Sequence, residues 1–179
     1  AHVQAGDAVV GLASSGVHSN GYSLVRKIVF AAAGLTVDAD GPEPGKSVGD
    51  TLLTPTRLYV KAVKGLVAHY PVKKRVIRGL ANITGGGLID NLGRILPPGK
   101  RAVLRRGSWP VPPVFGWLQK LGGVAQPEMD KVFNGGVGFC VVCGPAFANS
   151  IAKQCQDAGV DAWVIGEVVA GETGVEIAG

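Results

Sequence analysis

The stretch Gly11-Leu-Ala-Ser-Ser-Gly-Val-His-Ser-Asn-Gly-Tyr-Ser-Leu24 joins two segments with different hydrophobic patterns. Ahead of it, residues 8–13 form a short apolar run, which is typical of a buried strand. Behind it, apolar residues recur at the spacing of a helix face: Tyr22, Val25, Ile28 and Val29. The stretch therefore predicts a strand, a loop and a helix in direct succession.

Small and polar residues fill the loop between this strand and this helix. Gly16 and Gly21 allow positive φ and let a ligand approach the backbone amides. A helix that begins after such a loop offers unpaired N–H groups and its positive dipole end, which suit phosphate. The loop adds side-chain donors and one ionisable group: Ser14, Ser15, Ser19, Asn20 and His18. We interpret it as a ligand-binding loop, with a tight turn capped by serine or asparagine as the alternative.

A second glycine-rich loop repeats this arrangement. The sequence predicts a strand over 76–83, a break at Thr84-Gly85-Gly86-Gly87, and a helix from Leu88. Three successive glycines leave no Cβ to block a ligand. Two such loops indicate a polar or polyanionic ligand held between them, with these candidate binding residues on the second: Thr84, Gly85, Gly86, Gly87 and Asn91.

The segment Thr54-Pro55-Thr56-Arg57 carries a helix start signal. Thr54 can cap a helix whose first residue is Pro55. The apolar face of that helix would contain Leu58, Val63, Leu66 and Val67. Arg57 would then lie in the first turn, where a cation is electrostatically disfavoured. Arg57 is therefore either a ligand for an anion or a simply exposed arginine.

The remainder of the chain mixes strands and helices without strict alternation. We expect strands at 102–104, 139–143 and 160–169, and helices at 114–121, 127–132 and 145–158. Residues 38–45 are interpreted as a mobile surface loop. A third glycine cluster follows Asn134, whose amide either reaches a ligand or caps a turn. The pattern predicts an α+β fold, a layered α/β arrangement of helices on a mixed sheet.

Composition and charge exclude several classes of protein. The chain has 179 residues, 46% of them hydrophobic, which is enough for a domain with a sizeable core. Its basic clusters, at 73–78 and 100–106, have no interleaved aromatic residues, so we expect solvated faces or an anionic partner rather than nucleic acid. No apolar run is long enough to span a membrane, and the first residues do not resemble a signal peptide. The start, without Met, reads as the cut edge of a longer chain.

The number and spacing of the cysteines indicate the redox environment of the protein. The chain has three: Cys140, Cys143 and Cys155. The first two have the spacing of a metal or redox pair, but no second pair follows them. We expect buried, inert thiols and no metal site, in a protein of the reducing cytoplasm.

Together these motifs closely resemble the C-terminal domain of the aminoimidazole ribonucleotide (AIR) synthetase family, the phosphoribosylformylglycinamidine cyclo-ligases. Six stretches that cover nearly the whole chain carry the resemblance: 11–24, 52–61, 83–87, 109–115, 133–138 and 163–168. The resemblance implies one domain over residues 1–179, with a mixed sheet of partial ferredoxin-like topology. It implies a homodimeric enzyme that uses ATP to close the imidazole ring of formylglycinamidine ribonucleotide, giving AIR, ADP and phosphate.

The resemblance also implies a division of labour. ATP and magnesium in the family are held largely by acidic residues of an N-terminal domain, which nothing in this chain matches. The expected partners are therefore the small ribonucleotide substrate and that N-terminal domain, with neither nucleic acid nor membrane.

One residue departs from the family pattern. The family usually has His before the second glycine loop, where this chain has Asn82. Asn82 can donate a hydrogen bond but cannot exchange a proton near neutral pH. His18 and Asn82 are thus the candidate catalytic residues. Position 135, often Met or Cys in the family, is Gly135.

Two alternatives remain open. Selenophosphate synthetase and thiamine monophosphate kinase share the C-terminal fold, but the segments 54–57 and 109–113 argue against both. The second alternative is a non-catalytic module that binds a ligand or a partner.

Overall fold

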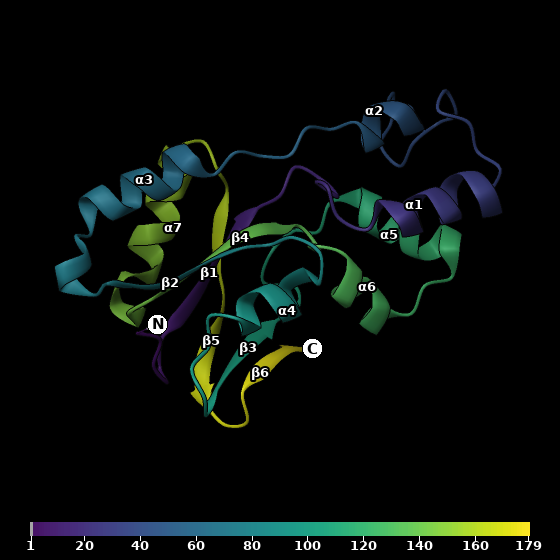
Figure 1. Ribbon diagram of the computed structural model, residues 1–179. Coiled ribbons are helices and arrows are strands. Elements are labelled where there is room, and N and C mark those ends of the chain that lie inside the picture. Colours follow the sequence, from purple (N-terminus) through teal and green to yellow (C-terminus); the bar gives the residue numbers. More distant parts are fainter. Residues whose placement is uncertain (1) are drawn as a thin grey trace.

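The central strand of the sheet is β1 (Ala8–Ala13), whose six residues are all buried. The computed structural model describes residues 2–179 and places β1 in a six-stranded sheet of order β2-β4-β1-β5-β3-β6 (Figure 1). The other strands are β2 (Ile77–Asn82), β3 (Lys100–Arg105), β4 (Val137–Cys143), β5 (Ala162–Ala170) and β6 (Gly174–Ala178). The β3–β6 pair is parallel and the other pairs are antiparallel, so the sheet is mixed, as predicted.

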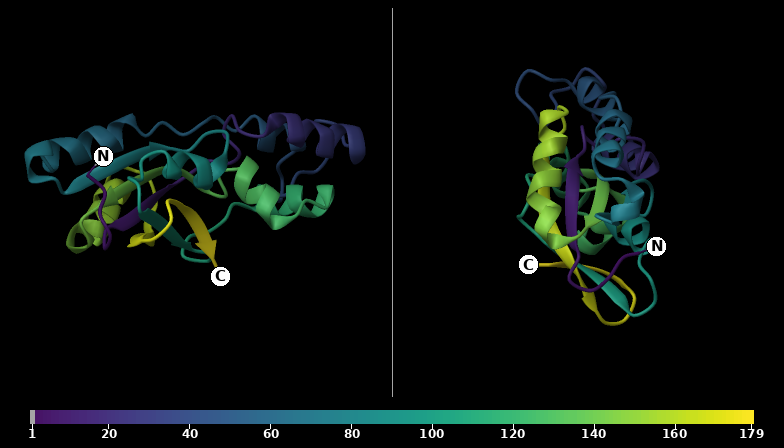
Figure 2. Two further views of the ribbon diagram at one scale, coloured as in Figure 1. Left: turned by 60° about the horizontal axis from the view of Figure 1, so that its bottom comes forward. Right: turned by 90° about the vertical axis from the view of Figure 1, so that its left-hand side faces the viewer.

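Four of these strands and two helices form a ferredoxin-like core. The chain runs β1-α3-β2 and later β4-α7-β5, and the strands lie in the order β2-β4-β1-β5. Helices α3 (Val60–His69) and α7 (Ala148–Asp157) lie side by side on one face (Figure 2), with the 3-10 turns Val72–Lys74 and Pro145–Phe147 beside them. Leu66 and Ile151 are fully buried there against β1 and β4. The expected ferredoxin-like topology is confirmed.

The opposite face of the sheet has a separate core. Helix α4 (Gly87–Gly93) covers it, and Leu92 and Ile165 are fully buried in that layer. Side chains of β4 alternate between the two faces, as a pleated strand requires: Cys143 belongs to the first core and Cys140 to the second.

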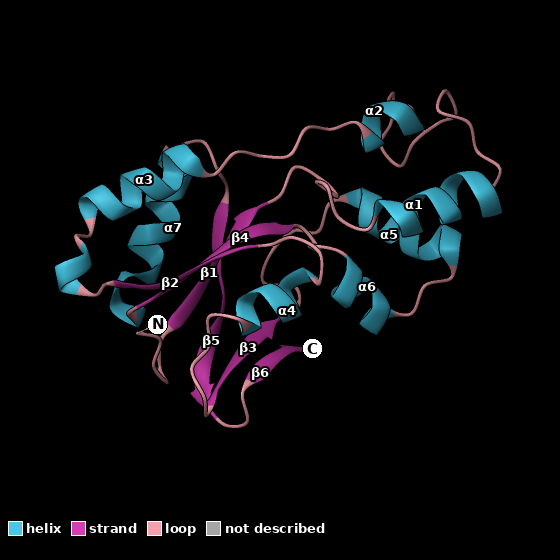
Figure 3. Ribbon diagram, viewed as in Figure 1, coloured by secondary structure: helices cyan, strands magenta, loops and turns pink. Residues whose placement is uncertain are grey.

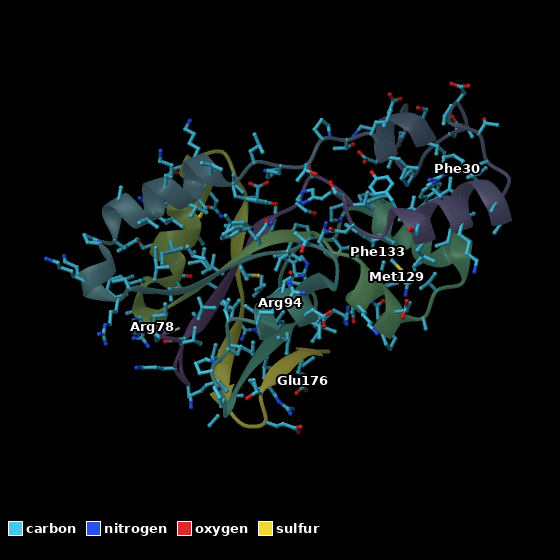
Figure 4. All side chains as sticks on the ribbon, viewed as in Figure 1. Phe30, Arg78, Arg94, Met129, Phe133 and Glu176 are labelled. Atoms are coloured by element: carbon cyan, nitrogen blue, oxygen red, sulfur yellow. The ribbon has the colours of Figure 1, made fainter. Side chains whose placement is uncertain are left out.

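A helical lobe lies beyond one end of the sheet. It contains α1 (Tyr22–Arg26), its π-helical continuation η1 (Lys27–Ala32), α2 (Val48–Leu52), α5 (Pro113–Gly122) and α6 (Gln126–Val132). Phe133 and Met129 lie together in its core (Figure 4). Gly123 ends α5 with a left-handed φ of 57°, as the glycine pair after that helix predicts.

The predicted helix start at Pro55 is wrong. Helix α3 begins at Val60, and residues 53–59 form an extended connector along one edge of the molecule (Figure 3). Thr54 precedes a proline, which keeps it out of the helical region, and its hydroxyl donates to the Asp50 carbonyl at the end of α2. Leu58 is consequently 81% exposed instead of packed on a helix face.

Two elements are absent from the sequence prediction. Helix α2 follows the exposed loop 38–45 and starts with a capping box, in which Ser47 and Asp50 each accept from the other's backbone N–H. The sequence analysis also does not predict β6, an edge strand that depends on pairing with β3, which lies far from it in the chain.

The basic clusters are only partly solvated faces. Lys73, Lys74 and Arg75 are exposed, but Arg78 pairs with the buried Asp7 at 2.6 Å. Arg106 likewise forms an ion pair with Asp130 at 2.7 Å. Within residues 2–179, no helix is both long and apolar enough to cross a membrane.

All three cysteines are buried and free, as expected. Burial raises the pKa of Cys140 and of Cys143 to about 12 and that of Cys155 to about 11. Since the thiolate is the reactive form, we expect no thiol of the folded protein to react with Ellman's reagent at pH 8. In the denatured chain, all three thiols should react. Rapid labelling of one thiol in the folded protein would contradict this assignment.

Candidate functional site

Four segments meet at one end of the ferredoxin-like core. The ends of β1 and β2 and the start of β4 lie at the same edge, since β1 and β2 both run antiparallel to β4. The loop after β1 is tied to the loop before β4, because the Ser14 N–H donates to the Gly136 carbonyl at 2.8 Å. The same loop is tied to the 53–59 connector by the Ser15 hydroxyl, which donates to the Pro55 carbonyl at 2.7 Å. The edge therefore joins both predicted ligand loops.

His18 stands at the centre of this meeting point. Its Nε2 accepts hydrogen bonds from the backbone N–H groups of Ser15 at 3.0 Å and Arg57 at 3.4 Å. A neutral imidazole with an accepting Nε2 carries its proton on Nδ1. Among residues 2–179, no hydrogen-bond partner faces that Nδ1. His18 is therefore fixed as a donor that is still available to a ligand.

The surroundings of His18 keep the imidazole neutral. Burial lowers its pKa from the ordinary 6.5, and the nearby positive charge of Arg57 lowers it further. The residue is only 7% exposed and has a positive φ of 56°, which few side chains tolerate. This strained, buried placement fits a binding role better than a surface turn.

Tyr59 and Gly138 support His18, and sequence reasoning did not single out either. The Tyr59 hydroxyl donates to the Ala13 carbonyl at 2.7 Å, at the end of β1. A Cβ on Gly138 would collide with the Tyr59 hydroxyl and with Cε1 of His18. The one available signal was a glycine inside an apolar strand, which often marks a close approach of neighbouring groups.

The remaining polar residues of the first loop have different roles. Ser14 is buried, and its hydroxyl has no hydrogen-bond partner in the described part of the chain. Ser19 lies 3.4 Å from the Thr56 hydroxyl, and the Asn20 amide reaches the Ile83 carbonyl at 3.5 Å. No side chain caps α1; its N-cap is Gly21, with a φ of 69°. The serine or asparagine cap offered as the alternative is thus not formed.

The second loop is held from inside by Asn91. Its amide nitrogen donates to the carbonyls of Thr84, Gly85 and Gly87, at 2.8–3.2 Å. Asn91 is only 5% exposed, so it shapes the loop and is not free to bind a ligand. A Cβ on Gly85 would meet no atom within 4 Å, which leaves this glycine open to an approaching molecule.

Three further candidate residues fall into two groups, one buried and one beside a cavity. Asn134 is fully buried, with its amide donating to the Gly16 carbonyl and accepting from the Gly136 N–H, each at 2.9 Å. The oxygen and the nitrogen of the amide both form hydrogen bonds inside the protein. Asn134 therefore stabilises a turn and is not free to bind a ligand. Arg57 and Asn82 instead line one open cavity beside the loop.

The donor set of this site suits an anion and not a divalent cation. Hydroxyls, amides and one neutral imidazole supply hydrogen-bond donors, and the unpartnered Ser14 hydroxyl is one of them. Across residues 2–179, no group of three His, Cys, Asp or Glu side chains is placed to hold a metal ion. Magnesium therefore does not fit these residues, whereas phosphate oxygens do.

Comparison with known proteins places this geometry in context. The family model described as "AIR synthase related protein, C-terminal domain" matches residues 4–178. A phosphoribosylformylglycinamidine cyclo-ligase of Symbiobacterium thermophilum is 47% identical over 175 residues, covering 96% of this chain and 48% of that protein. The same-named protein of Nitrosospira multiformis is 48% identical over 166 residues, covering 93% of this chain and 45% of the relative. The chain thus spans about half the length of these relatives.

Solved structures share the fold at low sequence identity. A thiamine-monophosphate kinase from Stenotrophomonas maltophilia has a TM-score of 0.61 and 14% identity, with 99% of this chain and 52% of that chain covered. The E. coli hydrogenase maturation protein HypE has a TM-score of 0.60 and 17% identity, with 99% and 47% covered. These likenesses concern the architecture alone.

Proposed function

The chain belongs to the AIR synthase related family, as its C-terminal domain, and from this premise we propose that it is half of a phosphoribosylformylglycinamidine cyclo-ligase. The observation that carries the proposal is the 44–48% identity to cyclo-ligases along almost the whole chain. The proposed reaction closes the imidazole ring of formylglycinamidine ribonucleotide, with ATP converted to ADP and phosphate. Residues 1–179 form one domain of this enzyme, next to an N-terminal domain of similar length.

In this proposal the chain positions the ribonucleotide. ATP supplies the phosphoryl group that activates the formyl oxygen, and both ATP and magnesium bind mainly to the N-terminal domain. His18 donates from Nδ1 to a substrate oxygen, while Ser14, the first-loop amides and Gly85 line the path of the bound molecule. Such fixed donors contribute to catalysis by positioning the substrate and by stabilising charge.

The proposal extends to the assembly and its surroundings. The chain spans about half of its relatives, which supports an N-terminal domain of the same protein as its first partner. We further propose a homodimer of the complete enzyme, located in the cytoplasm, where three free cysteines stay reduced.

The chain alone is expected to be inactive. Its glycine-rich loops lack the paired carboxylates that a magnesium–ATP site requires, so ring closure should be undetectable with the 179-residue chain and normal with the complete enzyme. Formation of AIR and release of ADP measure the activity, with thiamine monophosphate as the control substrate. Turnover by the chain alone would refute this division of labour, and turnover only with thiamine monophosphate would refute the proposed reaction.

A further inference from the structure

An open cavity adjoins the candidate site on the side of helix α3. Its volume is about 430 Å³, within the range of roughly 300–1,000 Å³ that small-molecule sites occupy. Apolar walls come from Leu58, Val63 and Phe139, whereas Arg57, Lys64 and Asn82 supply the polar groups. The cavity therefore offers cations and an amide at the border of an apolar surface.

The positive charges of this cavity are not neutralised by the protein. Neither Arg57 nor Lys64 takes part in an ion pair within the described residues. The sequence from 51 to 89 contains seven Lys or Arg residues and no Asp or Glu. Helix α3 begins beside the cavity with no acidic residue in its first turn and no side-chain cap. Charge, donors and helix dipole all favour a bound anion there.

The cavity borders the His18 site through Arg57 and Tyr59, which are among its lining residues. The Arg57 backbone N–H donates to His18, and the positive charge of its guanidinium adds to the effect of burial in lowering the pKa of His18. Asn82, at the end of β2, is exposed and has no hydrogen-bond partner within the described residues.

We propose that this cavity binds the phosphate group of a phosphate monoester, with Arg57 and Lys64 as its cationic contacts and Asn82 as an amide donor. The apolar walls hold the organic part of the ligand, next to the first loop. This inference rests on the proposed function, whose ribonucleotide substrate is such a monoester. It gives Asn82 a binding role, and it adds Lys64, which no sequence motif singled out.

The test measures binding to the 179-residue chain by calorimetry, with ribose 5-phosphate as the probe. Ribose and inorganic phosphate are the comparison ligands. Ribose 5-phosphate should bind more tightly than either, because only it contacts both the cations and the apolar walls. Lys64→Ala should weaken its binding about tenfold, as expected for the loss of a charged hydrogen-bond donor.

Lys61→Ala is the matched control. Lys61 lies on the same helix with the same charge but does not line the cavity, so its removal should change the affinity less than twofold. Equal weakening by both substitutions would overturn the inference, because it would indicate general attraction of anions. No binding of ribose 5-phosphate, or binding no tighter than that of inorganic phosphate, would overturn it too.

Turnover of the complete enzyme separates this inference from the proposed function. If ring closure proceeds and Lys64→Ala leaves KM unchanged, the cavity assignment fails and the function stands. If the wild-type enzyme closes no ring but the chain binds ribose 5-phosphate through Lys64, the function fails and the phosphate site stands.

Discussion

Replacing His18 with glutamine in the complete enzyme is expected to lower kcat/KM for ring closure by about 100-fold or more. Glutamine can place an acceptor oxygen near the two backbone N–H groups that Nε2 now accepts, so the loop should stay folded. It supplies no donor at the position of Nδ1, and the loss of one fixed donor typically costs 10²–10³ in rate. The melting temperature of the variant should change far less than its activity.

His18→Asn is the complementary substitution. Its amide nitrogen lies near the position of Nδ1, and asparagine tolerates the positive φ of 56°. It should retain more activity than His18→Gln, although it leaves the two N–H groups without their acceptor. If His18→Gln were the more active of the two, the donor role would be wrong. Imidazole ¹⁵N shifts of the wild-type protein should independently show a protonated Nδ1.

Because His18 is kept neutral, the stability of the folded chain should depend on pH. Its pKa is lowered in the folded chain, so below its ordinary value of 6.5 the unfolded chain binds the proton more readily. Its contribution to folding is therefore complete above that pH and falls as the pH decreases. His18→Gln removes this contribution, so its stability should decline less between pH 7 and pH 5 than that of the wild type.

The three glycines of the second loop are expected to respond very differently to alanine. Gly87→Ala should reduce the free energy of unfolding by about 3 kcal/mol, because φ is 59° and the new Cβ would collide with the backbone carbonyls of Asp130 and Phe133. Gly86→Ala should cost about 1–3 kcal/mol, because φ is 94° and the new Cβ would collide with the Asp90 side chain, whose carboxylate can rotate away but whose Cβ cannot.

Gly85→Ala is the informative member of this series. Its Cβ meets no protein atom and its φ is ordinary, so stability should change by less than about 0.5 kcal/mol. If the loop faces the substrate, KM should nevertheless rise several-fold in the complete enzyme. Melting curves and kinetics on the same preparations distinguish a loop that contacts the substrate from a purely structural one. An unchanged KM in Gly85→Ala would show that the loop is purely structural.

The regular elements of the fold could be predicted from local sequence. The strand, loop and helix around His18 were predictable because an apolar run, two glycines and a helical repeat agree within twenty residues. The start of α3 was not, because Thr54-Pro55 is compatible both with a helix cap and with an extended chain. Distant contacts decide it: the Pro55 carbonyl and the Arg57 N–H both bind the first loop.

The sequence predicts which loops form the site, but it does not predict which of their polar side chains are free to bind a ligand. Asn91 and Asn134 have the same chemistry as the exposed Asn82, yet their amides are used inside the protein. Tyr59 and Gly138 come from separate elements: the pairing of β1 with β4 brings Gly138 to His18, and a hydrogen bond to the Ala13 carbonyl holds Tyr59 beside it. Sequence alone does not show which polar group the finished packing leaves free.

The position of β1 in the sheet has a consequence for synthesis on the ribosome. This wholly buried strand is made long before its partners β4 and β5, which begin only at Val137 and Ala162. At about 5–20 residues per second, the apolar strand waits on the order of ten seconds before either partner leaves the ribosome. During that time it can pair with other nascent chains, so a chaperone that covers residues 8–13 should increase the yield of folded protein.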